Sequence, residues 1–225
     1  MKLLLVGYGR MGRLVEELAR QEGIDVAGRV DIDNISDEWP VADVAIDFST
    51  ADAVPQNLSR LAGLKVNVVI GTTGWSAREA ELRRVVDSSG IGVVASANFS
   101  IGVNVFQMIA TEAARLMAAR AEYGAWIHEA HHAAKIDAPS GTALMLRDAM
   151  TRAGLSRPVD MSSTRAGMIP GTHTIGFDSA SDTIELTHTA RDRRGFASGA
   201  LLAARWIHGR RGWFSMSDVL RGVRG

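Results

Sequence analysis

Short apolar runs alternate with helix-like segments over residues 1–100 of the chain. Continuous apolar runs predict buried strands, and apolar positions spaced three or four residues apart predict helices. The expected strands are Lys2–Val6, Asp25–Val30, Val44–Phe48, Val66–Ile70 and Gly92–Ala95, and the expected helices are Arg10–Gln21, Ala53–Leu61 and Ala77–Ser88. Strands that alternate with helices predict an α/β fold, here a Rossmann-like, doubly wound parallel sheet.

The pattern changes after Asn98, without a low-complexity linker. The expected helices are Val103–Arg120, Pro139–Ala153, Ala197–His208 and Met216–Val223, and the expected strands are Ala125–Ala130, Met161–Arg165, Thr172–Phe177 and Thr183–Thr189. Long helices beside clustered strands predict a second, smaller α+β domain with a mixed sheet. We therefore expect one domain over residues 1–103 and a second over residues 104–204.

Composition narrows the class of protein. Hydrophobic residues make up 46% and charged residues 22% of the 225 residues, which is enough for a packed core. The formal net charge is zero, which argues against nucleic acid as the main partner. The chain has no cysteine, which excludes disulfides and fits a reducing compartment. No stretch approaches about 18 consecutive apolar residues, so we expect a cytoplasmic protein with no membrane partner.

A glycine-rich loop joins the first strand to the first helix. It consists of Gly7, Tyr8, Gly9, Arg10, Met11 and Gly12, in the pattern G-x-G-x-x-G. The first glycine permits a tight turn, the second lets the backbone approach a pyrophosphate, and the third lets the helix pack on the strand. The alternative is a turn that only joins strand to helix. The full context of strand, loop, helix and a later acid favours a dinucleotide site.

The later acid is Asp31, at the end of the second expected strand. A carboxylate there can accept from a ribose 2′-hydroxyl and repels a 2′-phosphate. No lysine or arginine lies between Asp31 and Glu38. The sequence therefore predicts NADH as the preferred cofactor over NADPH.

Two further turns follow later strands, where ligands bind in sheets of this kind. The first contains Gly71, Thr72 and Thr73, and the second contains Ser96, Ala97, Asn98 and Phe99. From the residues alone, an ordinary structural turn is an equally good interpretation of each.

The segment Glu129–Leu146, EAHHAAKIDAPSGTALML, carries two histidines and a lysine ahead of an apolar helix pattern. On a strand, Glu129 and His131 point to one face, and His128 and His132 point to the other. Neighbouring histidines cannot then bind one metal ion easily, and the spacing matches no compact zinc pattern. We expect no metal here.

The end of this segment is typical of a helix start. Pro139 suits a first helical turn, and serine or aspartate suits its cap. Ser140, Gly141 and Thr142 would present backbone N–H groups, which can bind a carboxylate. Lys135 adds a positive charge, and histidine is suited to proton transfer near neutral pH. The alternative is a capped surface helix with polar residues before it.

Several of these segments together resemble one family. The motifs GYGRMG, IGTTG, ANFSIGVN and EAHHAAKIDAPSGTA, with RAGMIPGTHTIGF and LTHTARDRRGFASGAL, are similar to those of dihydrodipicolinate reductase (4-hydroxy-tetrahydrodipicolinate reductase). The resemblance covers most of the chain, and its histidine–lysine block is highly specific. It implies reduction of 4-hydroxy-tetrahydrodipicolinate to tetrahydrodipicolinate with NADH or NADPH and loss of water, in lysine and diaminopimelate biosynthesis.

The resemblance also implies residue roles. His131 would be the general acid/base, and Lys135 a proton donor or charge stabiliser. His132, Gly141 and Thr142 would bind substrate with Ser140 close by, and the three loops after the strands would hold the cofactor. The tail from about residue 205 to 225 would return to the first domain, and the second domain would also form a homotetramer.

The chain departs from the family in its short length and in the compact stretch between Ala153 and Arg165. Arg191, Arg193 and Arg194 form a basic cluster, which we interpret as a solvated loop, and we interpret His173 and His188 as structural. The rival hypothesis is another two-domain NAD-dependent dehydrogenase acting on a small dicarboxylate or amino acid. A non-catalytic NAD-binding module is a third possibility, without turnover.

Overall fold

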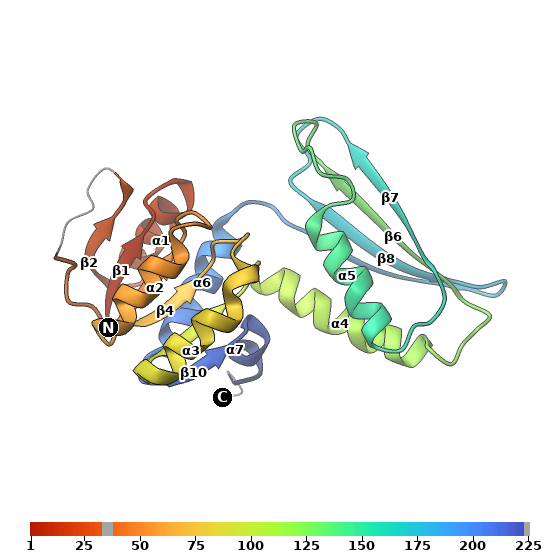
Figure 1. Cartoon of the computed structure of the whole chain (residues 1–225). Helices are drawn as coiled ribbons and strands as arrows, with labels where there is room; N and C mark the ends of the chain where they lie inside the picture. Colours follow the sequence, from red (N-terminus) through yellow and green to blue (C-terminus); the bar gives the residue numbers. More distant parts are fainter. Residues whose placement is uncertain (33–37, 223–225) are drawn as a thin grey trace. The chain divides into compact units, whose positions relative to one another are not determined.

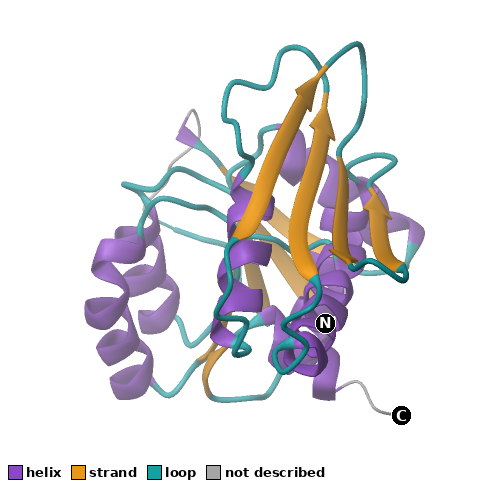
Figure 2. Cartoon of the chain, turned by 90° about the vertical axis from the view of Figure 1, so that its right-hand side faces the viewer, coloured by secondary structure: helices purple, strands orange, loops and turns teal. Residues whose placement is uncertain are grey.

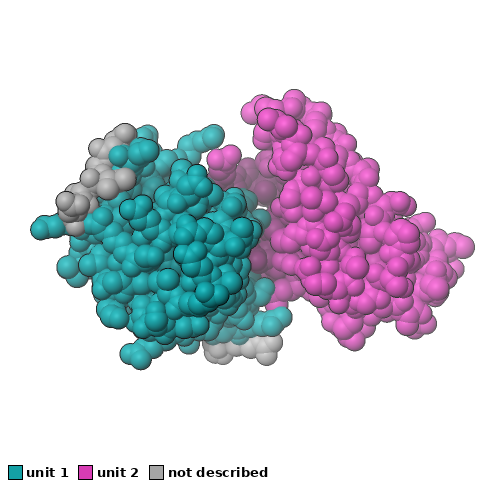
Figure 3. All heavy atoms as spheres, in the orientation of Figure 1, with its two compact units in different colours: residues 1–101, 194–225 teal, residues 102–193 magenta. Residues whose placement is uncertain are grey.

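The computed structural model describes residues 1–32 and 38–222, and the chain divides into two compact units (Figures 1 and 3). The first unit contains Met1–Ile101 and Arg194–Gly225, and the second unit contains Gly102–Arg193. The chain therefore returns to the first unit at Arg194, before the expected position near residue 205. The reason is that helix α6 (Arg194–Ile207) buries a row of apolar residues in the core of the first unit.

A six-stranded parallel sheet forms the centre of the first unit (Figure 1). Its strands are β1 (Lys2–Val6), β2 (Asp25–Val30), β3 (Val44–Asp47), β4 (Asn67–Ile70), β5 (Gly92–Ala95) and β10 (Gly212–Phe214). They lie in the order β10-β5-β4-β3-β1-β2, and every pair is parallel. The order reverses around β1, with β2 on one side and β3 on the other. Ligands of such sheets bind beyond the strand ends at this switch point.

Helices cover both faces of this sheet, because successive residues of each buried strand point to opposite faces. Helices α1 (Arg10–Gln21), α6 and α7 (Met216–Gly222) share one core cluster with Leu3, Leu5 and Ile46. Helices α2 (Val54–Gly63) and α3 (Glu79–Ser89) share the other with Leu4, Val6 and Ile70. A short 3-10 turn, η2 (Ser76–Arg78), precedes α3. The predicted doubly wound fold is confirmed.

Strand β10 is an element that the sequence pattern did not predict. It has only three residues and pairs parallel to β5, with Trp213 opposite Val93. A segment this short carries no measurable periodicity, and its pairing depends on a strand more than a hundred residues earlier in the chain. The predicted end of the last helix, Val223, lies outside the described residues.

The second unit contains helices α4 (Ile101–Met117) and α5 (Gly141–Arg152) and a four-stranded sheet, drawn as orange arrows in Figure 2. Its strands are β6 (Gly124–His131), β7 (Val159–Arg165), β8 (Thr172–Asp178) and β9 (Thr183–Thr189). They lie in the order β7-β6-β8-β9, with β6 and β7 parallel and the other pairs antiparallel. The predicted mixed sheet is therefore confirmed.

One face of this sheet forms the core of the second unit. Ile127, Ile175 and Phe177 pack there with Phe106 of α4 and Leu146 of α5. The opposite face carries polar and exposed residues on its outer strands, namely Asp160, Ser162, Thr164, Glu185, Thr187 and Thr189. Among the described residues, no helix has the length and apolar character needed to cross a bilayer.

Candidate functional site

The glycine loop of the first unit has the geometry that its pattern predicts. Gly7 has φ +84, and a Cβ there would lie 2.5 Å from the Phe48 carbonyl oxygen. A Cβ on Gly12 would lie 2.3 Å from the Gly7 carbonyl oxygen, so the start of α1 packs directly on the loop. Around Gly9 there is open space within 4 Å. Two glycines are thus required by packing, while the third leaves the backbone open to a ligand.

Asp31 follows β2 and lies beside this loop. Its Oδ2 accepts a hydrogen bond from the Tyr8 N–H at 3.1 Å, and its Oδ1 accepts from the Ile32 N–H at 2.9 Å. Gly7 and Asp31 line one pocket together with Trp39 and with Arg60, whose guanidinium lies 4.7 Å from the Trp39 ring centroid. The predicted acid therefore lies in a pocket at the switch point of the sheet.

A buried ion pair between α1 and β2 lies next to the loop. It was not predicted from the sequence. Glu16 on α1 is 3% exposed and accepts hydrogen bonds from the Tyr8 hydroxyl, Arg20 and Arg29. Hydrogen bonding from Arg29 lowers the pKa of Glu16 to about 2, against the opposing effect of burial. The Glu16 carboxylate is therefore charged at neutral pH, and the Arg29 guanidinium is already paired with it.

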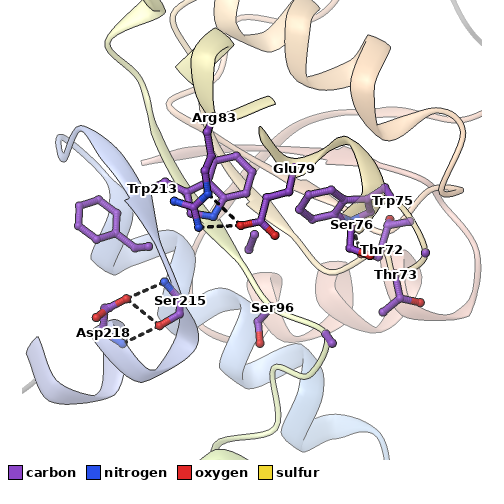
Figure 4. Close-up of a pocket in the computed structure, with 14 residues that line it drawn as sticks. Thr72, Thr73, Trp75, Ser76, Glu79, Arg83, Ser96, Trp213, Ser215 and Asp218 are labelled. Atoms are coloured by element: carbon purple, nitrogen blue, oxygen red, sulfur yellow. Dashed lines mark hydrogen bonds and ion pairs between the residues drawn. The ribbon is translucent and has the colours of Figure 1, made fainter. Parts of the chain in front are cut away.

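The turns after β4 and β5 line a second pocket of the first unit (Figure 4). From the predicted residues it includes Thr72, Thr73, Ser96 and Ala97. Trp75 from the loop after β4 adds to its wall, as do Trp213, Ser215 and Asp218 from β10 and the residues that follow it. The last three were not predicted here, because β10 was not predicted.

Other predicted residues of these two turns make structural contacts within the protein. The Phe99 side chain is 2% exposed in the core, and Asn98 accepts a hydrogen bond from the Ser100 N–H at 2.8 Å. A Cβ on Gly71 would lie 2.1 Å from the Phe48 ring, so this glycine is required by packing.

Asp47, at the end of β3, connects the loops of the two pockets. It is 1% exposed, and its Oδ1 accepts from the Ser49 N–H at 2.8 Å and from the Thr72 hydroxyl at 3.1 Å. Its Oδ2 accepts from the Asn57 amide at 2.9 Å. A buried carboxylate with this many donors holds Ser49 and Thr72 at fixed positions.

In the second unit, Glu129 and His131 point to the same face of β6, as predicted from the strand period. The Glu129 carboxylate and His131 Nδ1 form a hydrogen bond. His128 points to the other face, where its Nδ1 lies 2.9 Å from the Ser162 hydroxyl. Burial lowers the pKa of His131, and the Glu129 carboxylate opposes this effect.

Arg165 of β7 completes this group. Its guanidinium donates to both Glu129 oxygens, at 3.0 and 2.6 Å. Burial raises the pKa of Glu129, but hydrogen bonds from Arg165, Ser163 and His131 overcome that effect and lower it to about 2. A completely buried carboxylate therefore stays charged between an arginine and the candidate acid/base.

His173 of β8 lies against His131, with ring centroids 5.1 Å apart. It is 5% exposed, and its Nε2 lies 3.0 Å from the Ser140 hydroxyl. Burial and the nearby His131 lower the pKa of His173 to about 4, so the ring is neutral at pH 7. The strand period alone could not indicate this proximity, since it arises from the pairing of β6 with β8.

The predicted carboxylate site lies at the start of α5. Ser140 is the N-cap, and its hydroxyl accepts from the Ala143 N–H at 3.2 Å. Pro139 thus precedes the cap and does not lie in the first helical turn, as its residue type had suggested. Gly141 is exposed and Thr142 is half-buried at the helix start. The Gly141 N–H points to Asp137 Oδ2 at 3.4 Å.

Lys135 lies in the loop between β6 and α5. Its ammonium donates to Asp137 Oδ1 at 2.7 Å, and this bond lowers the pKa of Asp137. The carbonyl oxygen of His132 accepts from the Lys135 N–H at 3.1 Å. The described structure therefore brings the histidines, the lysine and the helix start together in one region of the second unit.

Glu129, His131 and His173 each offer one potential metal ligand, and these atoms lie within 4.8 Å of one another. Both Glu129 oxygens already accept from Arg165, which supplies the compensating positive charge. This donor set is therefore poorly suited to a cation. Arg191 and Arg193 are exposed, and Arg194 forms an ion pair with Glu17 at 2.8 Å.

Comparison with known proteins covers nearly the whole chain. Residues 1–99 match the family described as "Dihydrodipicolinate reductase, N-terminus", and residues 102–220 match "Dihydrodipicolinate reductase, C-terminus". A 4-hydroxy-tetrahydrodipicolinate reductase of Christiangramia forsetii is 35% identical, over 98% of each chain. The enzyme of the same name from Methanosarcina mazei is 37% identical, over 94% of this chain and 86% of its own.

Solved structures agree on the fold. The dipicolinate-bound dihydrodipicolinate reductase from Paenisporosarcina sp. TG-14 has a TM-score of 0.83 at 20% identity, covering 96% of this chain and 97% of that one. An aspartate dehydrogenase from Thermotoga maritima has a TM-score of 0.52 at 16% identity, covering 91% and 95%. The second likeness extends to the two-domain architecture and no further.

Proposed function

The chain belongs to the dihydrodipicolinate reductase family, and we propose that it reduces 4-hydroxy-tetrahydrodipicolinate to tetrahydrodipicolinate, with loss of water, in lysine and diaminopimelate biosynthesis. A bound nicotinamide dinucleotide supplies the hydride. The observation that carries the proposal is the grouping of His131, Lys135 and the start of α5 in the second unit. That grouping suits a small dicarboxylate that must be protonated as it is reduced.

Substrate carboxylates bind at the start of α5 in this proposal. The first N–H groups of a helix have no partner within the helix and carry partial positive charge. Gly141 and Thr142 supply such groups, and the Thr142 hydroxyl adds a donor. The Lys135 ammonium exchanges its bond to Asp137 for the incoming carboxylate, and His132 lies on the same loop. Ser140 contributes the cap that fixes this helix start.

His131 and Lys135 stabilise the reaction. Negative charge develops on the ring of the substrate as hydride adds to it, and a nearby positive charge lowers the energy of that state. Lys135 supplies a fixed charge, and protonated His131 can both stabilise the developing charge and deliver the proton.

The test is a reductase assay with the product of the preceding synthase as substrate, in which loss of NADH is followed. His131→Ala and Lys135→Ala are each expected to lower turnover by about 10² or more. His128→Ala is the matched control, because His128 lies on the same strand but points to the other face. Near-normal turnover in both variants would overturn the roles assigned to His131 and Lys135. If wild type oxidises an amino acid and does not reduce the proposed substrate, the rival dehydrogenase hypothesis is favoured.

We propose NADH as the preferred cofactor. Asp31 lies in the pocket beside Gly7, and Arg29, two residues earlier in the chain, is paired with Glu16. Arg60 lines the same pocket with its guanidinium over the Trp39 ring. Asp31→Asn removes the charge that repels a 2′-phosphate, so kcat/KM with NADPH is expected to rise relative to NADH. Asp25→Asn, at the exposed start of the same strand, is the control. A wild-type preference for NADPH contradicts this part of the proposal.

A homotetramer in the cytoplasm completes the proposal. The sheet of the second unit has an exposed polar face on which Thr174 pairs with Thr187 across β8 and β9. A second copy of this sheet can pack on that face. Sedimentation or light scattering measures the assembly, and a monomer at micromolar concentration contradicts this part.

A further inference from the structure

A buried glutamate lies directly beside the proposed acid/base of the second unit. The Glu129 side chain is 1% exposed, whereas the His131 side chain is 12% exposed. Their hydrogen bond uses Nδ1 of the imidazole, so Nε2 is left for another partner. A Cβ on Gly171 would lie 3.2 Å from this Nε2. The glycine therefore leaves room next to the nitrogen that Glu129 does not use.

Arg165 holds the glutamate in turn. Besides its two bonds to Glu129, its guanidinium donates to the Asp137 carbonyl oxygen at 2.6 Å. Asp137 also accepts from the Lys135 ammonium. One arginine thus connects the carboxylate behind His131 to the loop that carries Lys135. A bidentate arginine–carboxylate pair fixes orientation as well as charge.

We infer that Glu129, clamped by Arg165, is the positioning residue for His131, keeping a proton on Nδ1 and leaving Nε2 to exchange a proton with the substrate. The inference rests on the proposed role of His131 and extends it by assigning the tautomer and the group that sets it. A carboxylate that accepts from one imidazole nitrogen fixes which tautomer is present and stabilises the protonated ring.

The charges around His131 give this assignment a measurable consequence. His173 from β8, Arg165 from β7 and Lys135 from the loop all face His131, and positive charge on any of them disfavours its protonated form. Glu129 is the group in the described part of the chain that favours the protonated form. Without this carboxylate, His131 loses its proton at a lower pH.

The first experiment measures the pH dependence of kcat/KM in wild type and Glu129→Gln. An acid is active while protonated, so activity falls as pH rises through the pKa of His131. In Glu129→Gln this fall is expected about one pH unit or more lower. Turnover at pH 7.5 is expected to drop about 10-fold or more, part of the about 10² or more that a general acid supplies. KM for NADH is expected to stay unchanged.

The second experiment measures the tautomer directly, by ¹⁵N NMR of histidine in the unliganded protein, with His131→Asn to assign the signal. Wild type is expected to carry the neutral-state proton on Nδ1. In Glu129→Gln, part of the population is expected to shift the proton to Nε2. A merely structural glutamate would change neither the tautomer nor the pH profile.

Removing one partner of a buried ion pair strands the other, so Glu129→Gln could fail to fold. The double variant Glu129→Gln/Arg165→Met removes both charges at similar volume. It is expected to show a smaller pH shift in the same direction, because loss of Arg165 also removes a positive charge that disfavours protonated His131. Glu129→Asp keeps the carboxylate and is expected to restore part of the wild-type pH profile. Glu185→Gln, a carboxylate loss on exposed β9, is the matched control and leaves the profile unchanged.

The inference is overturned if folded Glu129→Gln or the double variant keeps the wild-type pH profile and the wild-type tautomer. That result is distinct from failure of the proposed function. If wild type does not reduce the substrate, or if His131→Ala turns over normally, the proposed function fails whatever Glu129 does.

Discussion

The candidate sites of the two units consist of different chemical groups. In the first unit the glycine loop offers backbone, and its critical positions Gly7 and Gly12 matter because they lack a side chain. In the second unit the site consists of ionisable side chains, Glu129, His131 and Arg165, carried by two strands. Ligand binding at the first site should therefore depend on the space that the glycines leave, and activity at the second on the protonation of its side chains. Different substitutions should disable the two sites.

Each unit nevertheless buries one charged glutamate against an arginine, and the two pairs serve different ends. Hydrogen bonding keeps Glu16 and Glu129 charged, with the pKa of each lowered to about 2. Glu16 supports a loop through the Tyr8 hydroxyl, whereas Glu129 contacts the proposed acid itself. A buried glutamate–arginine pair is thus structural in one unit and, in our inference, functional in the other.

The largest expected difference between the two units is a loss of folding stability in mild acid. It is expected to arise from His173 in the second unit. Burial lowers the pKa of His173 from 6.5 to about 4. Between these values the unfolded chain binds a proton at this residue and the folded chain does not. Stability is therefore full above about pH 6.5 and falls as pH drops toward 4, by about 3 kcal/mol for this shift.

The measurement is urea unfolding of wild type and His173→Gln between pH 8 and pH 4.5. Below about pH 5.5 Glu129 and Glu16 also bind protons on unfolding, since the pKa of each is lowered from 4.5 to about 2, so the slopes are compared above that pH. His173→Gln is expected to flatten most of the slope, while burial of His131 and His188 leaves a remainder of the same sign. Exposed His208→Gln should keep the full slope. An equal slope in His173→Gln would show that the acid sensitivity arises elsewhere.

The first unit shows why its site could be predicted from sequence. Strands β1, β3, β4 and β5 are short and mostly buried, with almost continuous apolar runs in sequence. The glycine loop begins at Gly7, directly after β1. Gly7, Gly9 and Asp31 owe their places in the fold to local geometry and to one strand pairing, β1 with β2. Period and motif together therefore predicted where these residues lie, and their cofactor role stays a prediction. The β10 strand and the Glu16–Arg29 pair could be seen only in the fold.

The second unit shows where such prediction ends. The strand period correctly placed Glu129 with His131, because that relation spans two residues. Arg165 and His173 reach the same group through pairing of β6 with β7 and with β8. Register between distant strands is decided by the burial of a whole face, which no local pattern contains. For that reason His173 was interpreted as structural, and no role was predicted for Arg165.

A smaller loss of folding stability is expected from filling the space at the glycine loop of the first unit. In Gly12→Ala, the new methyl group would meet the Gly7 carbonyl oxygen at 2.3 Å, and backbone cannot move aside cheaply. Overpacking of this kind costs about 1–3 kcal/mol in the free energy of unfolding. Gly63→Ala on α2 is the control, since a Cβ there meets nothing within 4 Å. Chemical denaturation measures both, and equal stabilities would refute the steric argument.

The smallest effect on stability, and the sharpest on binding, is expected for Gly9→Ala. This residue caps α1 with φ −75 and ψ −155, a conformation that alanine can adopt, and its Cβ would enter open space. Stability should therefore fall by no more than about 1 kcal/mol, the usual preference for glycine over alanine at a helix N-cap. The added methyl group would occupy the place where a pyrophosphate approaches the backbone, so NADH should bind about 10-fold more weakly, or about 1.4 kcal/mol.

Calorimetric titration with NADH and urea unfolding measure the affinity and the stability of Gly9→Ala on one sample. Unchanged NADH affinity would mean that the cofactor does not approach Gly9, and a large loss of stability would mean that packing, not ligand access, requires this glycine.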